Sequence, residues 1–403
     1  MSDSGHFSSR SVNGVRAPGV PVSFGTVSAT DQSEDQRTAR LLDWLERESS
    51  SGRFNGCVLV ADRNETLLEA ACGQADFRSG RPLTPGSLFE LASVTKPMTA
   101  IGLMILAERG FVDYNDPAAF YLPQLPYRDI TLRQLLTHTS GLPDYMELID
   151  RVWDRSVIAN NAAVLKLLNQ HQPQPIFPAG TDYAYSNTGY VMLASIIEAV
   201  SGKTYADFME QEVFRPAGMT RTTVYNRRTN PRDIQDFAHG FVMLPEASAP
   251  VLPDGQSEFD YVIYLDGIQG DGTIHSTVSD LWRLDWALRE EVLLSAKSQA
   301  LFLSETGCDV QLDNEDQSQP PLSRAFGWFA EPASHSSVGV KLSHGGGWPG
   351  YASLMIRYPE RAASIIMLTN LEADSFPMSA WQEELEQILG FVDTETKQTS
   401  APL

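Results

Sequence analysis

Cysteine and basic residues are scarce in this chain of 403 residues. Its three cysteines, Cys57, Cys72 and Cys308, are too few for a disulfide framework, and an odd number leaves at least one thiol free. We therefore expect a reducing compartment. The chain has 30 lysines and arginines against 51 aspartates and glutamates, which gives a net charge of −21. Because such a surface repels phosphate backbones and anionic lipid headgroups, we expect neither nucleic-acid nor membrane partners.

Long apolar runs and common hydrolase motifs are also missing. The first thirty residues hold no apolar stretch of signal-peptide length, and the run from Val191 to Val200 is short and contains Glu198. From these absences we expect no Sec export and no membrane crossing. We therefore expect a cytoplasmic protein. The seven histidines are scattered, and no H-E-x-x-H or G-x-S-x-G motif occurs. We expect no metal, no other cofactor and no α/β-hydrolase fold.

The chain does contain the composition and patterning of a folded protein with strands near both ends. Hydrophobic residues make up 42% and charged residues 20% of the chain, a balance typical of globular proteins. Residues 1–35 and 392–403 are unpatterned, and we expect them to be disordered tails. Apolar strand patterns occur early in the chain and again near its end, where a helix follows them. The predicted strands are 56–61, 67–72, 325–330, 351–357 and 363–368, and the predicted helix is 378–389.

Between these two β regions the chain is mostly helical in pattern. This order predicts an α+β fold that forms one domain at 36–391. Its sheet part would comprise about 36–110 and 270–391, and a helical insertion would comprise about 111–269. Clefts between such parts are frequent small-molecule sites. Two unpatterned stretches, 226–255 and 307–321, are expected to be surface loops, and no use is assigned to them.

A serine and a lysine stand at the start of a predicted helix, 94–109, that is apolar on nearly all sides. Pro97 fixes its start, so Ser93 lies in the first turn and Lys96 about one turn later. An amine desolvated at a helix start holds its proton less tightly and can take the proton of a serine nucleophile. The alternative is a helix-capping serine followed by a lysine that extends to solvent, and S-x-x-K alone leaves both open.

Two further segments allow a chemical or a structural interpretation. Tyr185 could shuttle a proton and Asn187 could bind a substrate amide, or they could be a core aromatic and a helix cap. The glycine run that begins at His344 matches G-x-G-x-x-G, but Pro349 and the strand after it exclude a dinucleotide turn. Its glycines either let a backbone amide approach a substrate, as an oxyanion hole requires, or form a tight turn. His138, which closes an apolar run, is assigned a structural role.

Several of these segments occur together in an order typical of one family. They are 89–97 (FELASVTKP), 135–142 (LLTHTSGL), Tyr185-Ser186-Asn187 and His344-Gly345-Gly346. With them the chain, over about residues 36–391, resembles the serine β-lactamase and penicillin-binding-protein-like hydrolases, most closely the group of class C β-lactamases, DD-peptidases and esterases. The resemblance implies a β-lactamase/transpeptidase-like α+β fold: an antiparallel sheet flanked by helices, plus an inserted all-helical domain.

The resemblance also implies an acyl-enzyme mechanism and a role for each motif residue. By similarity, Ser93 attacks a carbonyl carbon, while Lys96 and Tyr185 share the proton transfers. Asn187 would hold Lys96 and bind the substrate amide. The backbone amides of Ser93 and Gly347 would form the oxyanion hole.

The position of His344 bears on the substrate. In this family's true β-lactamases a lysine stands there, and a mostly neutral imidazole is a weaker anchor for a penicillin carboxylate. We therefore expect a small-molecule ester or D-amino-acid amide or peptide, bound with the help of Gly346, Trp348 and Tyr351. The alternatives are a biosynthetic transacylase, a β-lactamase or DD-peptidase, and a non-catalytic binding or scaffold protein that keeps the fold. The sequence does not predict the oligomeric state.

Overall fold

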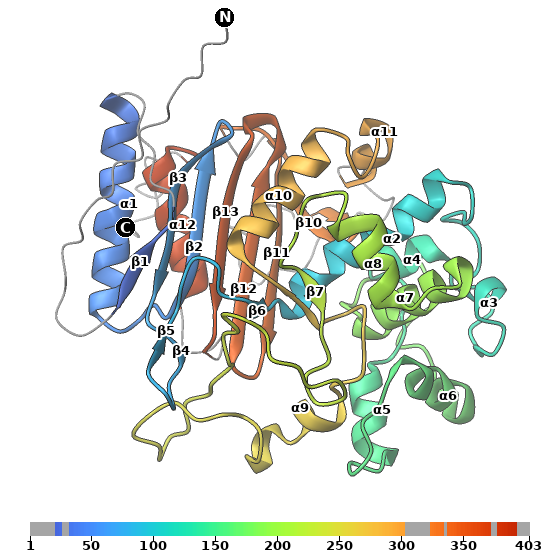
Figure 1. The fold of residues 1–403 in the computed structure, drawn as a ribbon. Helices are drawn as coiled ribbons and strands as arrows, with labels where there is room; N and C mark the ends of the chain where they lie inside the picture. The colour runs from blue at the N-terminus through green and yellow to red at the C-terminus, as the bar shows by residue number, and fades with distance from the viewer. Residues whose placement is uncertain (1–20, 26–31, 303–322, 334–336, 372–376, 393–403) are drawn as a thin grey trace, which may run out of the picture.

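The two ends of the chain build one sheet. A computed structural model describes residues 21–25, 32–302, 323–333, 337–371 and 377–392. Within them an eight-stranded sheet has the order β1-β3-β2-β13-β12-β11-β10-β9, and every neighbouring pair is antiparallel (Figure 1). The predicted antiparallel sheet is confirmed. Its strands are β1 Val22–Phe24, β2 Gly56–Asp62, β3 Glu65–Cys72, β9 Ser323–Ala325, β10 Trp328–Glu331, β11 Lys341–Trp348, β12 Tyr351–Tyr358 and β13 Ala363–Thr369.

Strand β2 lies at the join between the early and late parts of the chain, paired with β3 on one side and β13 on the other. All seven of its residues are buried. Because side chains alternate along a strand, Val58 and Val60 enter one core cluster while Cys57 and Leu59 enter the other. The sheet therefore needs a covering layer on each face.

Helices supply both layers. Helices α1 (Gln32–Ser50) and α12 (Met378–Leu389) cover one face, where Trp44 and Phe54 pack edge-on against Trp381 with ring centroids 6.2 and 5.4 Å apart. Helix α10 (Val278–Arg289) packs on β13 and β2 from the other face (Figure 1). Helix α2 (Thr95–Glu108) is buried along most of its length and connects this layer to the helical part of the molecule.

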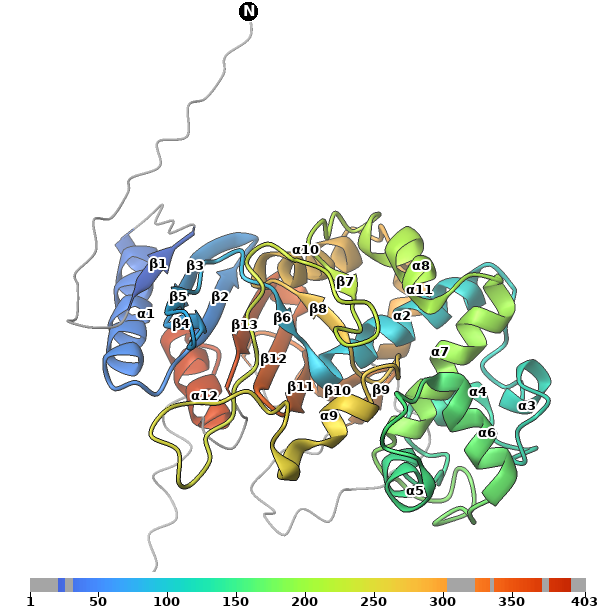
Figure 2. The same cartoon turned by 60° about the horizontal axis from the view of Figure 1, so that its bottom comes forward.

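The remaining helices gather mostly beside the sheet, on the side away from α1 (Figure 2). They are α3 Ala118–Tyr121, α4 Leu132–Leu136, α5 Tyr145–Val152, α6 Asn161–His171, α7 Asn187–Ser201, α8 Tyr205–Met209, α9 Tyr261–Tyr264 and α11 Ala296–Gln299. The range 111–269 is not all-helical, however, because β7 (Thr223–Val224) lies inside it. This strand joins β6 (Phe89–Glu90) and β8 (Ile274–Ser276) in a small sheet of order β6-β8-β7. A strand of two residues has no alternation for sequence reasoning to detect.

Three strand predictions need correction. The glycine run after His344 precedes the strand β12 as predicted, but it is not a turn: it lies within a strand of its own, β11, and its glycines pair with Leu354, Ser353 and Ala352 of β12. The predicted strand 325–330 is a hairpin of β9 and β10, because Gly327 turns the chain with a φ of +78°. Residues 22–24, expected in a disordered tail, form β1 on the edge of β3. Residues 32–35 of the same predicted tail begin helix α1, whereas residues 1–20, 26–31 and 393–403 lie outside the described residues.

A two-stranded sheet of β4 (Gln74–Asp76) and β5 (Arg81–Pro82) completes the strands of the described residues. Across that part of the chain no helix has the length and apolar character needed to cross a membrane. Cys57 and Cys72 are buried free thiols on neighbouring strands. Cys308 and the predicted loop 307–321 lie outside the described residues.

Candidate active site

The structure brings Ser93 and Lys96 together at the start of α2. Ser93 lies in a 3₁₀ turn, Ala92–Val94, and Lys96 is the second residue of the helix. The Lys96 Nζ donates to Ser93 Oγ at 3.0 Å and to the backbone oxygen of Asp271 at 2.8 Å. Lys96 is 0% exposed, so it does not extend to solvent. Ser93 does not cap the helix either, since Val94 occupies that position without a side-chain hydrogen bond.

Backbone strain and a glycine place the Ser93 turn. Ala92 has a φ of +46°, a left-handed conformation that costs a non-glycine residue about 1–2 kcal/mol. Gly346 of β11 faces this turn, and a Cβ there would lie 2.4 Å from the Leu91 carbonyl oxygen and 2.9 Å from the Ser93 nitrogen. The Ser353 hydroxyl donates to that same carbonyl at 2.6 Å. Strand β11 therefore approaches the turn closely because position 346 carries no side chain.

Tyr185 lies beside the lysine. The Lys96 Nζ is 4.9 Å from the centroid of the Tyr185 ring, which is 38% exposed. The ring of Tyr185 stacks on His138 at 4.5 Å, and the Nδ1 of His138 accepts from the Ser186 N–H at 3.0 Å. Ser186 is the residue that caps α7, by accepting from the Gly189 N–H. The structural role predicted for His138 is thus to hold the segment that carries Tyr185.

Asn187 begins α7 and lines the cavity, but its contacts differ from those the resemblance implied. Its Nδ2 donates to Asp144 Oδ2 at 3.3 Å, while the amine of Lys96 bonds to Ser93 and to the Asp271 carbonyl. The Asp271 carboxylate accepts from the Tyr145 hydroxyl at 2.9 Å, and burial raises the pKa of Asp271. Asp271 thus connects the lysine to the helical part of the molecule.

His344 is buried on β11 and neutral. Its side chain is 2% exposed, and its Nδ1 lies 2.6 Å from the backbone oxygen of Gly345, which makes Nδ1 the protonated nitrogen. Burial, with a smaller contribution from the charge of Lys96, lowers the pKa of His344 to about 3. Its ring centroid is 6.1 Å from that of Tyr185. The imidazole therefore presents no positive charge to a carboxylate at neutral pH.

Ser93 opens into a cavity of about 380 Å³ between the sheet and the helical part. Asn187, Gly347, Trp348 and Tyr351 also line it, as expected for binding residues. The Trp348 ring packs edge-on against Tyr261 of α9 at 5.4 Å, and the hydroxyl of Tyr351 donates to the Ala238 carbonyl at 2.8 Å. Gly346 faces the serine turn, and its predicted part in substrate binding stays a prediction. Around α9 the lining combines the apolar side chains of Val262, Leu265 and Ile268 with the Tyr261 phenol and with Asp266, whose carboxylate accepts from Arg228.

Sequence reasoning missed a charged group in the same cavity. Glu90, Arg227, Arg228 and His275 all line it. Glu90 lies within the motif 89–97, but it was given no role, and no motif contains the other three. The two arginines belong to the predicted loop 226–255, which is therefore part of the cavity wall and not only a surface loop. Among the described residues no group of three or more His, Cys, Asp or Glu side chains is placed to hold a metal ion.

Comparison with known proteins identifies the class. The β-lactamase family model matches residues 33–387, so the chain belongs to the β-lactamase family, whose relatives here are serine hydrolases with the β-lactamase/transpeptidase-like fold.

Three known proteins illustrate the similarity. Penicillin-binding protein 4* of Bacillus subtilis is 42% identical over 337 residues, covering 84% of this chain and 72% of that protein. Teichoic acid D-alanine hydrolase of Staphylococcus aureus is 25% identical over 289 residues, covering 72% of this chain and 65% of that protein. The structure of EstCE1, a hydrolase with promiscuous acyltransferase activity, superimposes with a TM-score of 0.72 at 20% identity, covering 89% of this chain and all of that one.

Proposed function

We propose that this serine hydrolase acts through an acyl-enzyme on Ser93 and cleaves esters or D-amino-acid amides of small molecules. The observation that carries the assignment is the 3.0 Å hydrogen bond between Ser93 Oγ and the fully buried Lys96. A buried amine without a carboxylate partner is costly, and its place against a cavity-lining hydroxyl gives it a chemical use.

The proposed steps follow from this placement. In the reacting form the hydrogen bond reverses: the Ser93 hydroxyl donates to an unprotonated Lys96 Nζ, which accepts the proton as Ser93 Oγ bonds to the carbonyl carbon and the C=O electron pair moves onto oxygen. The amides of Ser93 and Gly347 stabilise that oxyanion. When the C–O or C–N bond breaks, the leaving group takes a proton through Tyr185, next to the lysine. Water then cleaves the acyl-enzyme by the reverse sequence.

The substrate class rests on His344. Because burial keeps the imidazole neutral, the position supplies no charged clamp for the carboxylate of a penicillin. An ester or amide needs only the nucleophile and the oxyanion hole. The relative named teichoic acid D-alanine hydrolase supports a D-alanyl substrate, and EstCE1, named as a hydrolase, has the same fold.

The test compares three substrate classes on the purified protein. We expect kcat/KM for p-nitrophenyl acetate and for the phenyl ester of D-alanine to exceed that for benzylpenicillin at least tenfold, with a mass increase of one acyl group on the intact protein. Faster turnover of penicillin would assign a β-lactamase or DD-peptidase. Absence of any acyl adduct would leave a binding or scaffold protein and refute the proposal.

Acyl transfer is a second candidate, favoured by the apolar wall around α9. The side chains of Val262, Leu265 and Ile268 give part of the cavity an apolar lining, which offers water no hydrogen-bond partner there. The measurement is the ratio of ester product to free acid when a short alcohol is added. If this product ratio exceeds the molar ratio of alcohol to water, the enzyme prefers acyl transfer. If the product ratio is lower, the enzyme prefers hydrolysis.

We further propose a cytoplasmic location and the division of the domain into a sheet part and a helical insertion at about 111–269. Two buried free thiols, Cys57 and Cys72, support the first point, because reduced thiols persist in reducing compartments. Cell fractionation tests it. Limited proteolysis with cuts near 111 and 269 tests the second.

A further inference from the structure

One carboxyl group in the catalytic cavity has no partner of opposite charge. Glu90 ends β6, three residues before Ser93, and its side chain is 16% exposed and lines the cavity. Among the described residues its nearest recorded polar contact is His275 Nε2, 3.9 Å from Glu90 Oε2. The two residues are directly opposite on β6 and β8, so they face the same side of the small sheet.

His275 does not neutralise this carboxyl. Its Nδ1 lies 3.3 Å from the Thr273 carbonyl oxygen, so Nδ1 carries the proton and Nε2 turns a lone pair toward Glu90. Burial lowers the pKa of His275 to about 3, with nearby Arg227 and Arg232 acting in the same direction. The imidazole is therefore neutral at pH 7.

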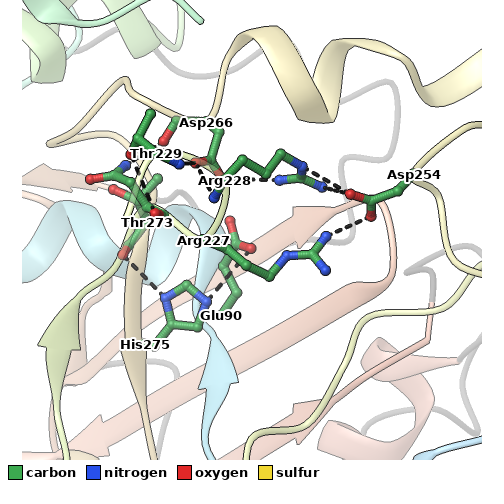
Figure 3. Close-up of polar contacts among 9 residues, drawn as sticks. Glu90, Arg227, Arg228, Thr229, Asp254, Asp266, Thr273 and His275 are labelled. Carbon is green, nitrogen blue, oxygen red and sulfur yellow. Dashed lines mark hydrogen bonds and ion pairs between the residues drawn. The ribbon is translucent and has the colours of Figure 1, made fainter. Parts of the chain in front are cut away.

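The neighbouring arginines are already paired. Arg227 donates to Asp254 at 2.5 Å, and Arg228 donates to Asp254 at 2.9 Å and to Asp266 at 3.0 Å (Figure 3). These two arginines and two aspartates cancel, which leaves Glu90 without an ion pair among the described residues. Arg232 is outside the cavity lining, where it stacks on the Tyr225 ring at 4.9 Å and donates to the Thr223 hydroxyl. Burial accordingly raises the pKa of Glu90 to about 7, an increase that the two arginines limit.

The walls around Glu90 also suit a cation. Tyr225 and Phe237 line the cavity, and their rings pack against His275 at 5.4 and 5.5 Å. Aromatic rings attract cations, and the Tyr225 ring already holds the Arg232 guanidinium at 4.9 Å, which leaves Phe237 as the ring for a substrate cation. Tyr351, on β12, is the further titratable group close to Glu90, and burial together with the Glu90 charge keeps its phenol protonated.

We propose that Glu90 is the receptor for a primary ammonium group on the substrate, so that this enzyme selects esters and amides with a free amine. The inference rests on the proposed function. An ammonium group would complete the charge balance of the cluster and give Glu90 the charge-assisted hydrogen bond that it lacks. Arg227 and Arg228, which are both held by Asp254, form another part of the wall of this cavity.

The test uses two pairs of phenyl esters that differ only in the amine: D-alanine against propionate, and 6-aminohexanoate against hexanoate. The two lengths place the amine near to and far from the scissile carbonyl. We expect the wild type to prefer the amine in at least one pair by about 10- to 100-fold in kcat/KM, the range of a hydrogen bond to a charged group. For 6-aminohexanoate, whose alkyl amine stays protonated, the preference should grow as the pH rises through about 7, where Glu90 ionises. For D-alanine the preference should pass through a maximum, because an α-amine loses its proton at about pH 8.

Glu90→Gln should abolish this preference, chiefly by raising KM for the amine esters until their kcat/KM equals that of their amine-free partners, while Glu90→Asp should retain part of the preference. Glu210→Gln is the matched control and should change neither, because Glu210 is an exposed residue of the short π-helix Glu210–Phe214 and is not in the cavity lining. A preference that persists in Glu90→Gln, or no preference in either pair, would overturn the inference. Equal losses for amine and amine-free esters, with accumulation of acyl-enzyme, would overturn it in favour of a role in deacylation. Failure to cleave all four esters would instead refute the proposed function.

Discussion

A single methyl group at position 346 should disable the enzyme, whereas the same group at position 345 should not. In Gly346→Ala the new Cβ would lie 2.4 Å from both the Leu91 carbonyl oxygen and the Ser353 hydroxyl, and ordinary contact begins near 3.4 Å. Strand β11 and the serine turn must therefore separate by about 1 Å. At Gly345 the nearest atom to a new Cβ is 3.8 Å away, so nothing has to move.

That displacement has two measurable consequences. It moves the Gly347 amide relative to Ser93, and a misplacement of about 1 Å typically lowers kcat/KM by about 100-fold. Overpacking of this kind lowers the free energy of unfolding by about 1–3 kcal/mol. The assays are p-nitrophenyl acetate hydrolysis and urea unfolding of both variants. If Gly346→Ala and Gly345→Ala behave alike in both assays, the close approach of β11 does not set the site.

Three further results are expected. Lys96→Met should lower kcat/KM for esters by about 100- to 10,000-fold, the usual contribution of general acid–base catalysis, and a loss below tenfold would contradict its role as the base. Since His344 is neutral, matched esters with and without a carboxylate should show parallel pH–rate profiles, and His344→Lys should raise kcat/KM only for the ester with the carboxylate. If kcat/KM of the wild type falls above pH 6.5 for that ester alone, His344 is instead a carboxylate receptor. Burial lowers the pKa of His344 from 6.5 to about 3, so between these two pH values the unfolded chain binds a proton that the folded protein does not. The free energy of unfolding therefore falls as the pH drops below about 6.5, and His344 has no effect on it above that pH. In urea unfolding between pH 7 and 5, His344→Gln should remove up to about 1.4 kcal/mol per pH unit of that loss, whereas exposed His171→Gln should leave it unchanged.

The order of apolar patterns along the chain was enough to predict the sheet. Strands β2, β3, β12 and β13 have continuous apolar runs because both of their faces are covered, and helix α12 has the predicted bounds Met378–Leu389. Strand β11 escaped prediction because three successive glycines carry no side-chain pattern. Its pairing with β12 and its contact with the serine turn hold it in the sheet.

The candidate site divides in the same way. Ser93, Lys96, Tyr185 and His344 were predictable because family motifs mark them, although the sequence gives no hint that Lys96 bonds to the Asp271 carbonyl. Glu90 and the paired arginines were not predictable. They lie close together only because a strand pair and a loop bring residues more than 130 positions apart to the same cavity. The sequence around a glutamate or an arginine contains no pattern that predicts such a distant neighbour.

The most direct test of the account is the position of the acyl group. The wild type and Ser93→Ala would be treated with a fluorophosphonate and, separately, with p-nitrophenyl acetate, and the modified peptide identified by mass spectrometry. We predict one adduct on the peptide that contains Ser93 in the wild type, and none in a Ser93→Ala protein that unfolds at the same temperature. An adduct on another residue, or one that persists in folded Ser93→Ala, would contradict the assignment of Ser93 as the nucleophile.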